Sequence, residues 1–200
     1  MANKTGPWGL RPIGHKNGAP WNGAVTACRI GAAYTAGAMF IGDPVVYNDD
    51  KSDGDDPPTM PSVIAGTGAA GQIVLGAIVA FDPNPDNLSL VYRVDDTSRI
   101  AYVAMGADVV FEIRDDGSGT YNTAWVGANA AMVDAGGSTV TGLSGFALDG
   151  TTPAATQNMG LHILGFSTRS DNEGAIYAIW NVRLNTSLNA TGDSLGVLST

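Results

Sequence analysis

The amino-acid sequence predicts an all-β protein, either an antiparallel β-barrel or a β-sandwich, with little helix and an extended N-terminal arm. The first observation is alternation: in residues 88–94 and 109–114, apolar and polar side chains exchange at every second position. A period of two is typical of a strand with one face on a core. The second observation is spacing. The apolar runs are of strand length, and the residues between them are mostly Gly, Pro, Asn, Asp and Ser, which favour turns.

Residues 72–114 are predicted to form an antiparallel meander on which the rest of the fold packs. Its four strands are expected at residues 73–81, 88–94, 100–105 and 109–114. Residues 73–81 carry no charge and are apolar on both faces. This strand is therefore expected to be the most buried one, or to be covered on its second face by a partner chain. Ile78, in its middle, is a candidate core or interface residue.

Residues 1–23 are predicted to form an extended arm, because their Pro and Gly content disfavours any regular element. The arm nevertheless holds side chains suited to a buried surface, and its candidate partner-binding residues are Trp8, Leu10, Arg11, Ile13 and Trp21. We expect the arm to lie on its own domain or on a neighbouring subunit, and the neighbour is favoured because an arm can tie subunits together. Removing residues 1–22 is expected to leave a folded core that assembles poorly.

Residues 24–184 are predicted to form a single β domain, or two β subdomains that meet near residues 115–145. Outside the meander, strands are expected at residues 25–30, 38–41, 44–47, 145–149, 161–166 and 175–184. In the last strand, the residues that alternation places on one core-facing side are Ile176, Ala178, Trp180, Val182 and Leu184. Residues 123–133 have the apolar density of a short helix, but Gly127 and Asn129 favour strand or loop.

Two segments are expected to lie outside the packed body. Residues 48–61 are rich in Asp and Pro and are predicted to be a solvated loop. A weak cation site formed by Asp53, Asp55 and Asp56 stays open as an alternative. Residues 185–200 are predicted to be a polar tail, either loose or laid on a partner.

The composition excludes some classes of partner. The chain has 10 Lys and Arg against 19 Asp and Glu, a formal net charge of −9, and no basic stripe. This argues against nucleic acid as a partner. No run approaches the ~18 apolar residues of a membrane span, so no membrane association is expected. Only 14% of the residues are charged, which favours a surface partly covered by other subunits. Cys28 is the only cysteine and is expected to be a buried thiol.

Catalytic and cofactor-binding patterns are weak. Residues 66–71 match the letters of the dinucleotide fingerprint, but a strand rather than a helix is expected to follow them. The only histidines, His15 and His162, are too few for a metal cage or a catalytic triad, and His162 is expected to be a satisfied strand residue. The polar group at residues 169–173 is interpreted as a stabilised turn. We therefore expect no enzymatic activity and no catalytic, metal-binding or cofactor-binding residue.

Several segments, taken in order, resemble a family of virion structural proteins from tailed bacteriophages, especially environmental ones. They are TGPWGLRPIGH (5–15), FIGDPV (40–45), VLGAIVAF (74–81), GANAAMV with TGLSGFALD (127–149), LHILGFSTRSDNE (161–173) and AIWNVRLN (178–185). The resemblance implies a capsid decoration, or cement, protein that is β-rich and homotrimeric. Such a protein would assemble in the host cytoplasm, bind the major capsid protein on the outer surface of the virion and stabilise the coat without catalysis. The family pattern assigns no catalytic residue.

Two other functions stay open. The chain could be another phage structural protein, namely a head fibre, a tail component or a host-surface-binding protein. It could also be a carbohydrate-binding β module with Trp125 or Trp180 as its aromatic platform, although alternation favours Trp180 as a core residue.

Overall fold

The structure is a computed structural model that describes residues 3–48, 60–69, 71–155 and 159–185. Twelve strands and one short 3-10 turn, η1 (Thr123–Trp125), make up its regular elements. The strands form antiparallel sheets in a sandwich-like arrangement and do not close into a barrel. The all-β prediction is therefore confirmed, and of its two alternatives the structure has the sandwich.

Two five-stranded sheets and one ribbon contain all of these strands. Sheet A has the order β1 (Arg11–His15), β7 (Val109–Arg114), β12 (Ile179–Leu184), β11 (Leu161–Phe166) and β8 (Asn129–Ala130). Sheet B has the order β2 (Thr26–Ile30), β6 (Arg99–Met105), β5 (Gly76–Phe81), β3 (Pro44–Tyr47) and β4 (Val63–Ala65). The ribbon pairs β9 (Met132–Asp134) with β10 (Phe146–Leu148).

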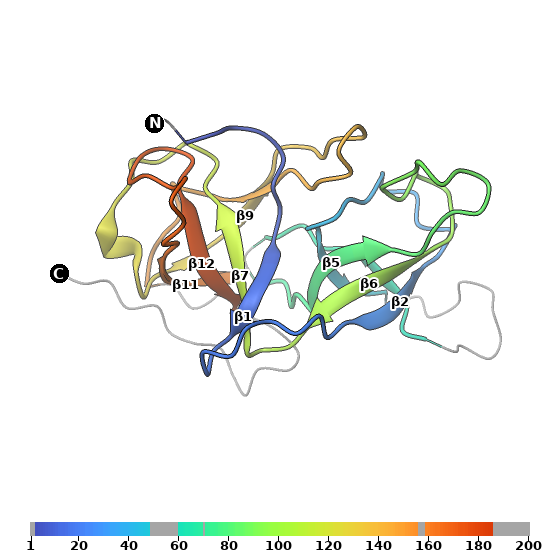
Figure 1. The fold of residues 1–200 in the computed structure, drawn as a ribbon, viewed down its shortest axis with the longest axis horizontal. Coiled ribbons are helices and arrows are strands. Elements are labelled where there is room, and N and C mark those ends of the chain that lie inside the picture. The colour runs from blue at the N-terminus through green and yellow to red at the C-terminus, as the bar shows by residue number, and fades with distance from the viewer. Residues whose placement is uncertain (1–2, 49–59, 70, 156–158, 186–200) are drawn as a thin grey trace.

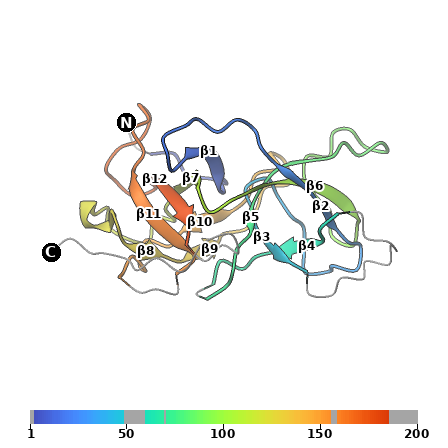
Figure 2. The ribbon, with the colours of Figure 1, turned by 90° about the horizontal axis from the view of Figure 1, so that it is seen from below.

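The two sheets lie at opposite ends of the long axis of the molecule (Figure 1), and the view from below shows the same division (Figure 2). The chain passes from sheet A to sheet B between β1 and β2 and returns to sheet A between β6 and β7, at residues 106–108. The predicted meander is therefore divided: β5 and β6 pair in sheet B, whereas β7 belongs to sheet A.

The prediction of a strand at residues 88–94 is wrong. This segment is a series of turns, and Leu88 is 79% exposed. The physical reason lies in Arg93, which is fully buried. Its side chain donates to backbone carbonyls of the surrounding loops and so holds the segment against those loops rather than against a neighbouring strand. Residues 38–41 are also not a strand and make only isolated bridges, from Met39 to Arg93 and from Ile41 to Leu143.

The strand β5 is apolar on both faces because it lies between the two hydrophobic clusters of this chain. Val74 and Ala77 belong to the cluster that also contains the buried side chains of sheet A. Leu75 and Ile78 belong to the cluster of sheet B. Ile78 has 0% exposure, so it is a core residue and is not accessible to a partner. No second chain is needed to cover this strand.

The prediction that residues 1–23 contain no regular element is also wrong. Residues 11–15 form β1, which pairs antiparallel with β7. β1 is the edge strand of sheet A, and an edge is where a sheet tolerates the missing N–H of Pro12. Leu10, just before β1, is 1% exposed and joins the core, and Trp21 packs partly against the same cluster. The first residues of the chain therefore contribute to sheet A of their own molecule.

Most of the remaining predictions of secondary structure are confirmed, and one strand is shorter than predicted. The strands at 25–30, 44–47, 145–149 and 161–166 are confirmed as β2, β3, β10 and β11. Residues 123–133 are mostly strand and loop, as favoured, with η1 at their start. Strand β12 begins only at Ile179, since Tyr177 has a φ of 63° and interrupts the extended backbone. Trp180 lies in the core as predicted, whereas Ile176 is 51% exposed.

Two predicted segments lie mostly outside the described residues. Residues 49–59 of the acidic loop, which include the candidate cation ligands Asp53, Asp55 and Asp56, are among them. The predicted C-terminal tail is described only at Asn185.

The sheets are joined at a tight backbone contact between Gly9, Gly42 and Ser144. Gly9 has a φ of +68°, and a Cβ placed on it would lie 2.6 Å from the Cβ of Ser144 and 2.8 Å from the Cα of Gly42. The N–H of Leu10 donates to the carbonyl of Gly42 at 3.0 Å, and the N–H of Gly42 donates to the carbonyl of Ile78 at 2.7 Å. Glycine is required here both for its backbone conformation and for the close approach.

A buried carboxylate lies at the same junction. Asp43 is 4% exposed, and its Oδ2 accepts a hydrogen bond from the N–H of Phe40 at 2.8 Å. Burial raises the pKa of Asp43 from 3.8 to about 6, and the negative charge of Asp134 acts in the same direction. Hydrogen bonds from Ser144 and Phe40 oppose the rise. The folded protein therefore binds a proton at Asp43 at a pH at which the unfolded chain does not.

This difference predicts a stability that falls as pH rises from about 4 to about 7. The cost of burying the ionised carboxylate above pH ~6 is roughly 3 kcal/mol for a pKa rise of this size. Asp43→Asn keeps an oxygen acceptor for Phe40 but carries no charge. The variant is expected to be more stable than the parent at neutral pH, with the difference shrinking toward pH ~4. Urea unfolding at several pH values measures this, and parallel curves for the two proteins would contradict it.

Candidate interaction surface around Trp8

The described part of the chain places three arginines around one tryptophan. The guanidinium carbons of Arg11, Arg169 and Arg114 lie 3.7, 5.3 and 5.5 Å from the ring centroid of Trp8. All three distances are within the range of cation–π attraction. We call Trp8, Arg11, Arg169 and the neighbouring Tyr177 the Trp8 surface; Arg114, 6% exposed, lies beneath it.

The strands of sheet A position two of these arginines. In β7, Val109, Phe111 and Ile113 point into the core, so the alternating residues Glu112 and Arg114 point to the opposite face. Arg11 of β1 lies directly across from Glu112 in the ladder. The third arginine, Arg169, comes from the loop between β11 and β12. Residues far apart in the sequence therefore meet on one side of one sheet.

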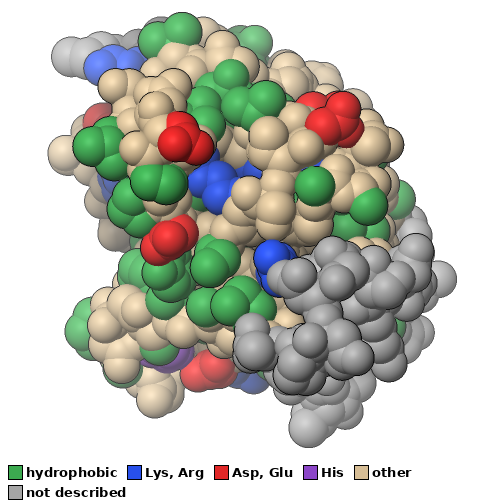
Figure 3. All heavy atoms as spheres, turned by 90° about the vertical axis from the view of Figure 1, so that its right-hand side faces the viewer, with side chains coloured by type: hydrophobic (Ala, Val, Ile, Leu, Met, Phe, Trp, Pro, Cys, Tyr) green, Lys and Arg blue, Asp and Glu red, His purple; other side chains and the backbone are tan. Residues whose placement is uncertain are grey.

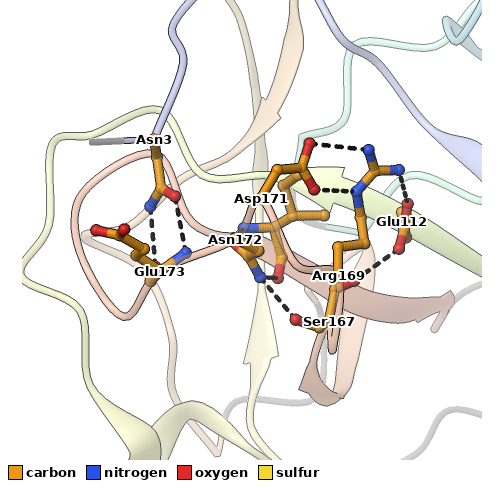
Figure 4. Close-up of polar contacts among 8 residues, drawn as sticks. Asn3, Glu112, Ser167, Arg169, Asp171, Asn172 and Glu173 are labelled. Carbon is orange, nitrogen blue, oxygen red and sulfur yellow. Dashed lines mark hydrogen bonds and ion pairs between the residues drawn. The ribbon is translucent and has the colours of Figure 1, made fainter. Parts of the chain in front are cut away.

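The loop that carries Arg169 is fixed by side-chain hydrogen bonds (Figure 4). The side chain of Asn172 accepts from the N–H of Ile179 at 2.8 Å and donates to the carbonyls of Ser167 and Ile179 at 2.8 and 2.9 Å. Arg169 makes two contacts with Asp171, at 2.9 and 3.0 Å, and one with Glu112 at 3.4 Å. The interpretation of residues 169–173 as a stabilised turn agrees with this arrangement.

The N-terminal segment is fastened over the same loop. The side-chain amide of Asn3 donates to the carbonyl of Glu173 at 2.9 Å and accepts from the N–H of Glu173 at 2.8 Å (Figure 4). It also donates to the carbonyl of Ile176 at 3.1 Å. Arg114 donates to the carbonyl of Lys4. Trp8 is therefore held between two anchored segments rather than on a free arm.

Arg11 differs from the other two arginines because no hydrogen-bond acceptor among the described residues engages it. Its guanidinium stacks on Trp8, and both carboxylate oxygens of Glu112 opposite it already accept, from Ser167 at 2.7 Å and from Arg169 at 3.4 Å. Burial, and then the positive charge of Arg169, lower the pKa of Arg11, while Glu112 acts in the opposite direction. Arg11 thus keeps its donors available for an incoming acceptor.

Two hollows flank the ring of Trp8. One has a volume of about 240 Å³ and the other about 190 Å³, and the residues that line both are Trp8, Arg114 and Tyr177. Sites for small organic ligands usually measure about 300–1,000 Å³. Hollows of this size suit single side chains of a larger partner.

Tyr177 is held in a strained backbone conformation beside these hollows. Its φ is 63°, a region that residues other than glycine rarely adopt. The carboxylate of Asp115, 3% exposed, accepts from the N–H groups of Tyr177 and Ala178 at 2.7 and 2.8 Å. A third N–H, that of Gly117, donates to the same carboxylate at 2.9 Å. Strain held by surrounding structure is common at binding sites.

The residues predicted to bind a partner fall into two groups. Trp8 and Arg11 belong to the Trp8 surface, and Ile13, 39% exposed, lies on β1 next to it. Leu10 and Ile78 are core residues, and Trp21 lies partly on the core. The sequence analysis missed Arg114, Arg169 and Tyr177. Alternation in β7 could have placed Arg114 on the outer face, but no signal in the sequence brings Arg169 next to Trp8.

Other candidate sites have structural explanations. His162 pairs with the buried Asn129 through Nδ1 at 2.7 Å, and burial, with the charges of Arg183 and Lys16, lowers its pKa. Trp125 and Trp180 are buried with their ring centroids 5.3 Å apart, so neither is an exposed sugar platform. After the glycines at 66–71 comes β5, a strand, as expected. Within the described ranges, no group of three or more His, Cys, Asp or Glu is arranged to hold a metal ion.

No protein-family model matches the chain, and no curated protein matches it. Among the described residues, no helix is long and apolar enough to cross a membrane.

Proposed function

We propose that this chain is a non-enzymatic decoration, or cement, protein of a tailed-bacteriophage head. In this proposal it forms a homotrimer, binds the major capsid protein on the outer surface of the virion and stabilises the coat lattice. The observation that carries the proposal is the origin of the Trp8 surface. Two of the segments that resemble phage virion proteins, 5–15 and 161–173, lie near opposite ends of the chain, yet they supply Trp8, Arg11 and Arg169 to one surface.

The chemistry of this surface suits a protein partner. Tryptophan, tyrosine and arginine are the residue types that most often dominate the binding energy of protein interfaces. The Trp8 surface combines all three, and hydrogen bonds from Asn3, Asn172 and Asp115 hold its segments in place. A surface ordered before binding loses less conformational entropy on association. Stable attachment to a large assembly benefits from such preorganisation.

The other resembling segments support a structural function. Segments 5–15, 40–45, 74–81 and 141–149 meet at the junction of Gly9, Gly42, Ile78 and Ser144. At this junction, residues of these segments hold the two sheets together. Such use of sequence motifs is expected of a protein selected for a rigid shape.

Capsid binding tests the proposal directly. Trp8→Ala combined with Arg169→Ala is expected to weaken binding to heads that lack the protein by at least about tenfold, as for loss of an interface hot spot. Co-sedimentation of purified protein with such heads measures this, and thermal melting checks that the variant is folded. The matched control is Val140→Ala, at a side chain that is 88% exposed in a different loop. Equal binding by the double variant and the parent, or no binding by the parent, would contradict the proposal.

The copy number in purified virions separates this proposal from its nearest alternative. A cement protein covers the lattice and is present in hundreds of copies, whereas a head-fibre, tail or host-surface-binding protein is present in few. Quantitative mass spectrometry of whole particles distinguishes the two.

A further inference from the structure

We propose that Arg11 of the Trp8 surface binds a carboxylate side chain, that of an Asp or Glu residue on the outer surface of the major capsid protein. This contact rests on the proposed function and deepens it, because it names the chemical group of the coat that the Trp8 surface recognises.

Arg11 is held in place without a hydrogen-bond acceptor. Its guanidinium carbon lies 3.7 Å from the ring centroid of Trp8, where cation–π attraction restricts its position. A guanidinium that lies over an aromatic ring keeps its N–H donors at its edge, directed away from the ring. No acceptor in the described part of the chain engages these donors. Arg11 is therefore oriented before a partner arrives.

The carboxylates around Trp8 are engaged elsewhere. Glu112 lies opposite Arg11 in the ladder, but its oxygens accept from the hydroxyl of Ser167 at 2.7 Å and from Arg169 at 3.4 Å. Asp171 contacts Arg169 through both of its oxygens, at 2.9 and 3.0 Å. The guanidinium of Arg169 thus lies between these two carboxylates (Figure 4), and neither accepts from Arg11.

Two further carboxylates of sheet A also have partners of their own. Asp108 lies 3.0 Å from Nδ1 of His15. Asp115 accepts from three backbone N–H groups, at 2.7, 2.8 and 2.9 Å. Positive and negative side chains are therefore mixed on this sheet, and what distinguishes Arg11 is its unengaged donors rather than a surplus of positive charge.

A carboxylate suits Arg11 better than a neutral acceptor does. Burial, and then the positive charge of Arg169, lower the pKa of Arg11, and the negative charge of Glu112 opposes them by less. A carboxylate beside the guanidinium would offset both unfavourable effects, whereas a backbone carbonyl would supply a hydrogen bond without the compensating charge. Arginine and carboxylate also form two parallel hydrogen bonds, which adds geometric specificity.

The surroundings of Arg11 suit a carboxylate that belongs to a protein. Trp8 also lines two hollows of about 240 and 190 Å³, which have room for single side chains next to the acidic residue. An ion pair surrounded by such packed contacts loses its water and becomes strongly dependent on both partners.

The arginines at the opposite end of the molecule are less suited to this contact. Basic, acidic and apolar side chains are interspersed on that end (Figure 3). Arg93 is 0% exposed, and Arg99 donates to the carbonyls of Leu90 and Asp82 at 2.8 and 3.1 Å. Arg29 donates to the hydroxyl of Ser98 at 3.4 Å. The donors of these arginines are already in use, unlike those of Arg11.

Variants of Arg11 measure the strength of the contact. Arg11→Gln is expected to weaken co-sedimentation with heads that lack the protein by at least about tenfold, as for loss of one partner of a desolvated charge pair. Arg11→Lys keeps the charge but not the fork of donors, so a smaller loss of about threefold is expected. The matched control is Lys16→Gln, which removes a positive charge at an exposed site just after β1 and is expected to bind like the parent. Thermal melting checks that each variant is folded.

Neutralising the carboxylates of the coat identifies the group that Arg11 binds. The probe is heads treated with a carbodiimide and glycinamide, which convert exposed Asp and Glu side chains into neutral amides, and electron microscopy selects preparations that stay intact. The parent is expected to bind treated heads at least about tenfold more weakly than untreated heads. Arg11→Gln has already lost the contact, so its binding to the two kinds of head is expected to agree within about twofold.

The outcomes separate this contact from the proposed function. If treatment weakens the parent and Arg11→Gln equally, the coat carboxylates act elsewhere, and if it leaves the parent unchanged, the group bound is not a carboxylate. Either result overturns the contact and leaves capsid binding standing, as does a loss of binding by the Trp8 and Arg169 double variant that Arg11→Gln does not share. A parent that does not bind untreated heads overturns the proposed function and this contact with it.

Discussion

Replacing Arg93 with methionine is expected to destabilise the protein by about 3–5 kcal/mol, because it leaves several buried backbone carbonyls without a hydrogen-bond donor. Arg93 is fully buried and donates to the carbonyls of Gly31, Tyr34, Gly37 and Thr97. Methionine has a similar length but no donor. The carbonyls would remain in place without their partner, and each buried unsatisfied group costs about 1–3 kcal/mol.

Urea unfolding of the two proteins measures this difference. The matched control is Lys16→Met, at an exposed site, where a change within about 0.5 kcal/mol is expected for an ordinary surface substitution. A loss below about 1 kcal/mol in Arg93→Met would mean that the loops around Arg93 keep their conformation without it.

Arg93 also shows why alternation predicts some strands and fails for others. Residues 109–114 alternate, and the apolar half of the pattern faces the core of sheet A. Residues 88–94 alternate equally well, yet their apolar residues are largely exposed, and the one fully buried side chain is the arginine. Alternation of apolar and polar residues indicates only that a segment is compatible with a strand. It does not predict a side chain such as Arg93, which donates hydrogen bonds to residues 31–37 and 97.

The prediction of an N-terminal arm without regular structure fails for a related reason. Pro and Gly do disfavour strands in the middle of a sheet, but β1 is an edge strand with a register shift between Pro12 and Gly14. Its partner β7 lies nearly a hundred residues away along the chain. Local composition therefore predicts an unpaired arm, whereas in the structure β1 forms backbone hydrogen bonds with the distant strand β7.

The Trp8 surface was predictable only in part. Trp8 and Arg11 stood out because an aromatic and a cation in a Pro- and Gly-rich segment suggest a contact rather than a solvated tail. Their neighbours could not be named in advance, since Arg114 and Arg169 reach Trp8 through the pairing of β1 with β7 and the folding of the β11–β12 loop. Spatial neighbours of this kind follow from sheet order, which the sequence alone does not determine.

Leu10→Ala is expected to cost about 2–5 kcal/mol, the range for truncating a large buried side chain. Leu10 is 1% exposed and packs in the cluster of sheet A. Ile13→Ala, three residues further along the chain in β1, is the matched control: Ile13 is 39% exposed, so a loss of less than about 1 kcal/mol is expected. Removing residues 1–22 deletes β1 together with Leu10 and is expected to cost more than Leu10→Ala, contrary to the folded core expected from sequence. Urea denaturation measures all three proteins. A truncated protein that unfolds at the same midpoint as the full chain would mean that β1 adds nothing to the fold and that residues 1–23 act only toward other molecules.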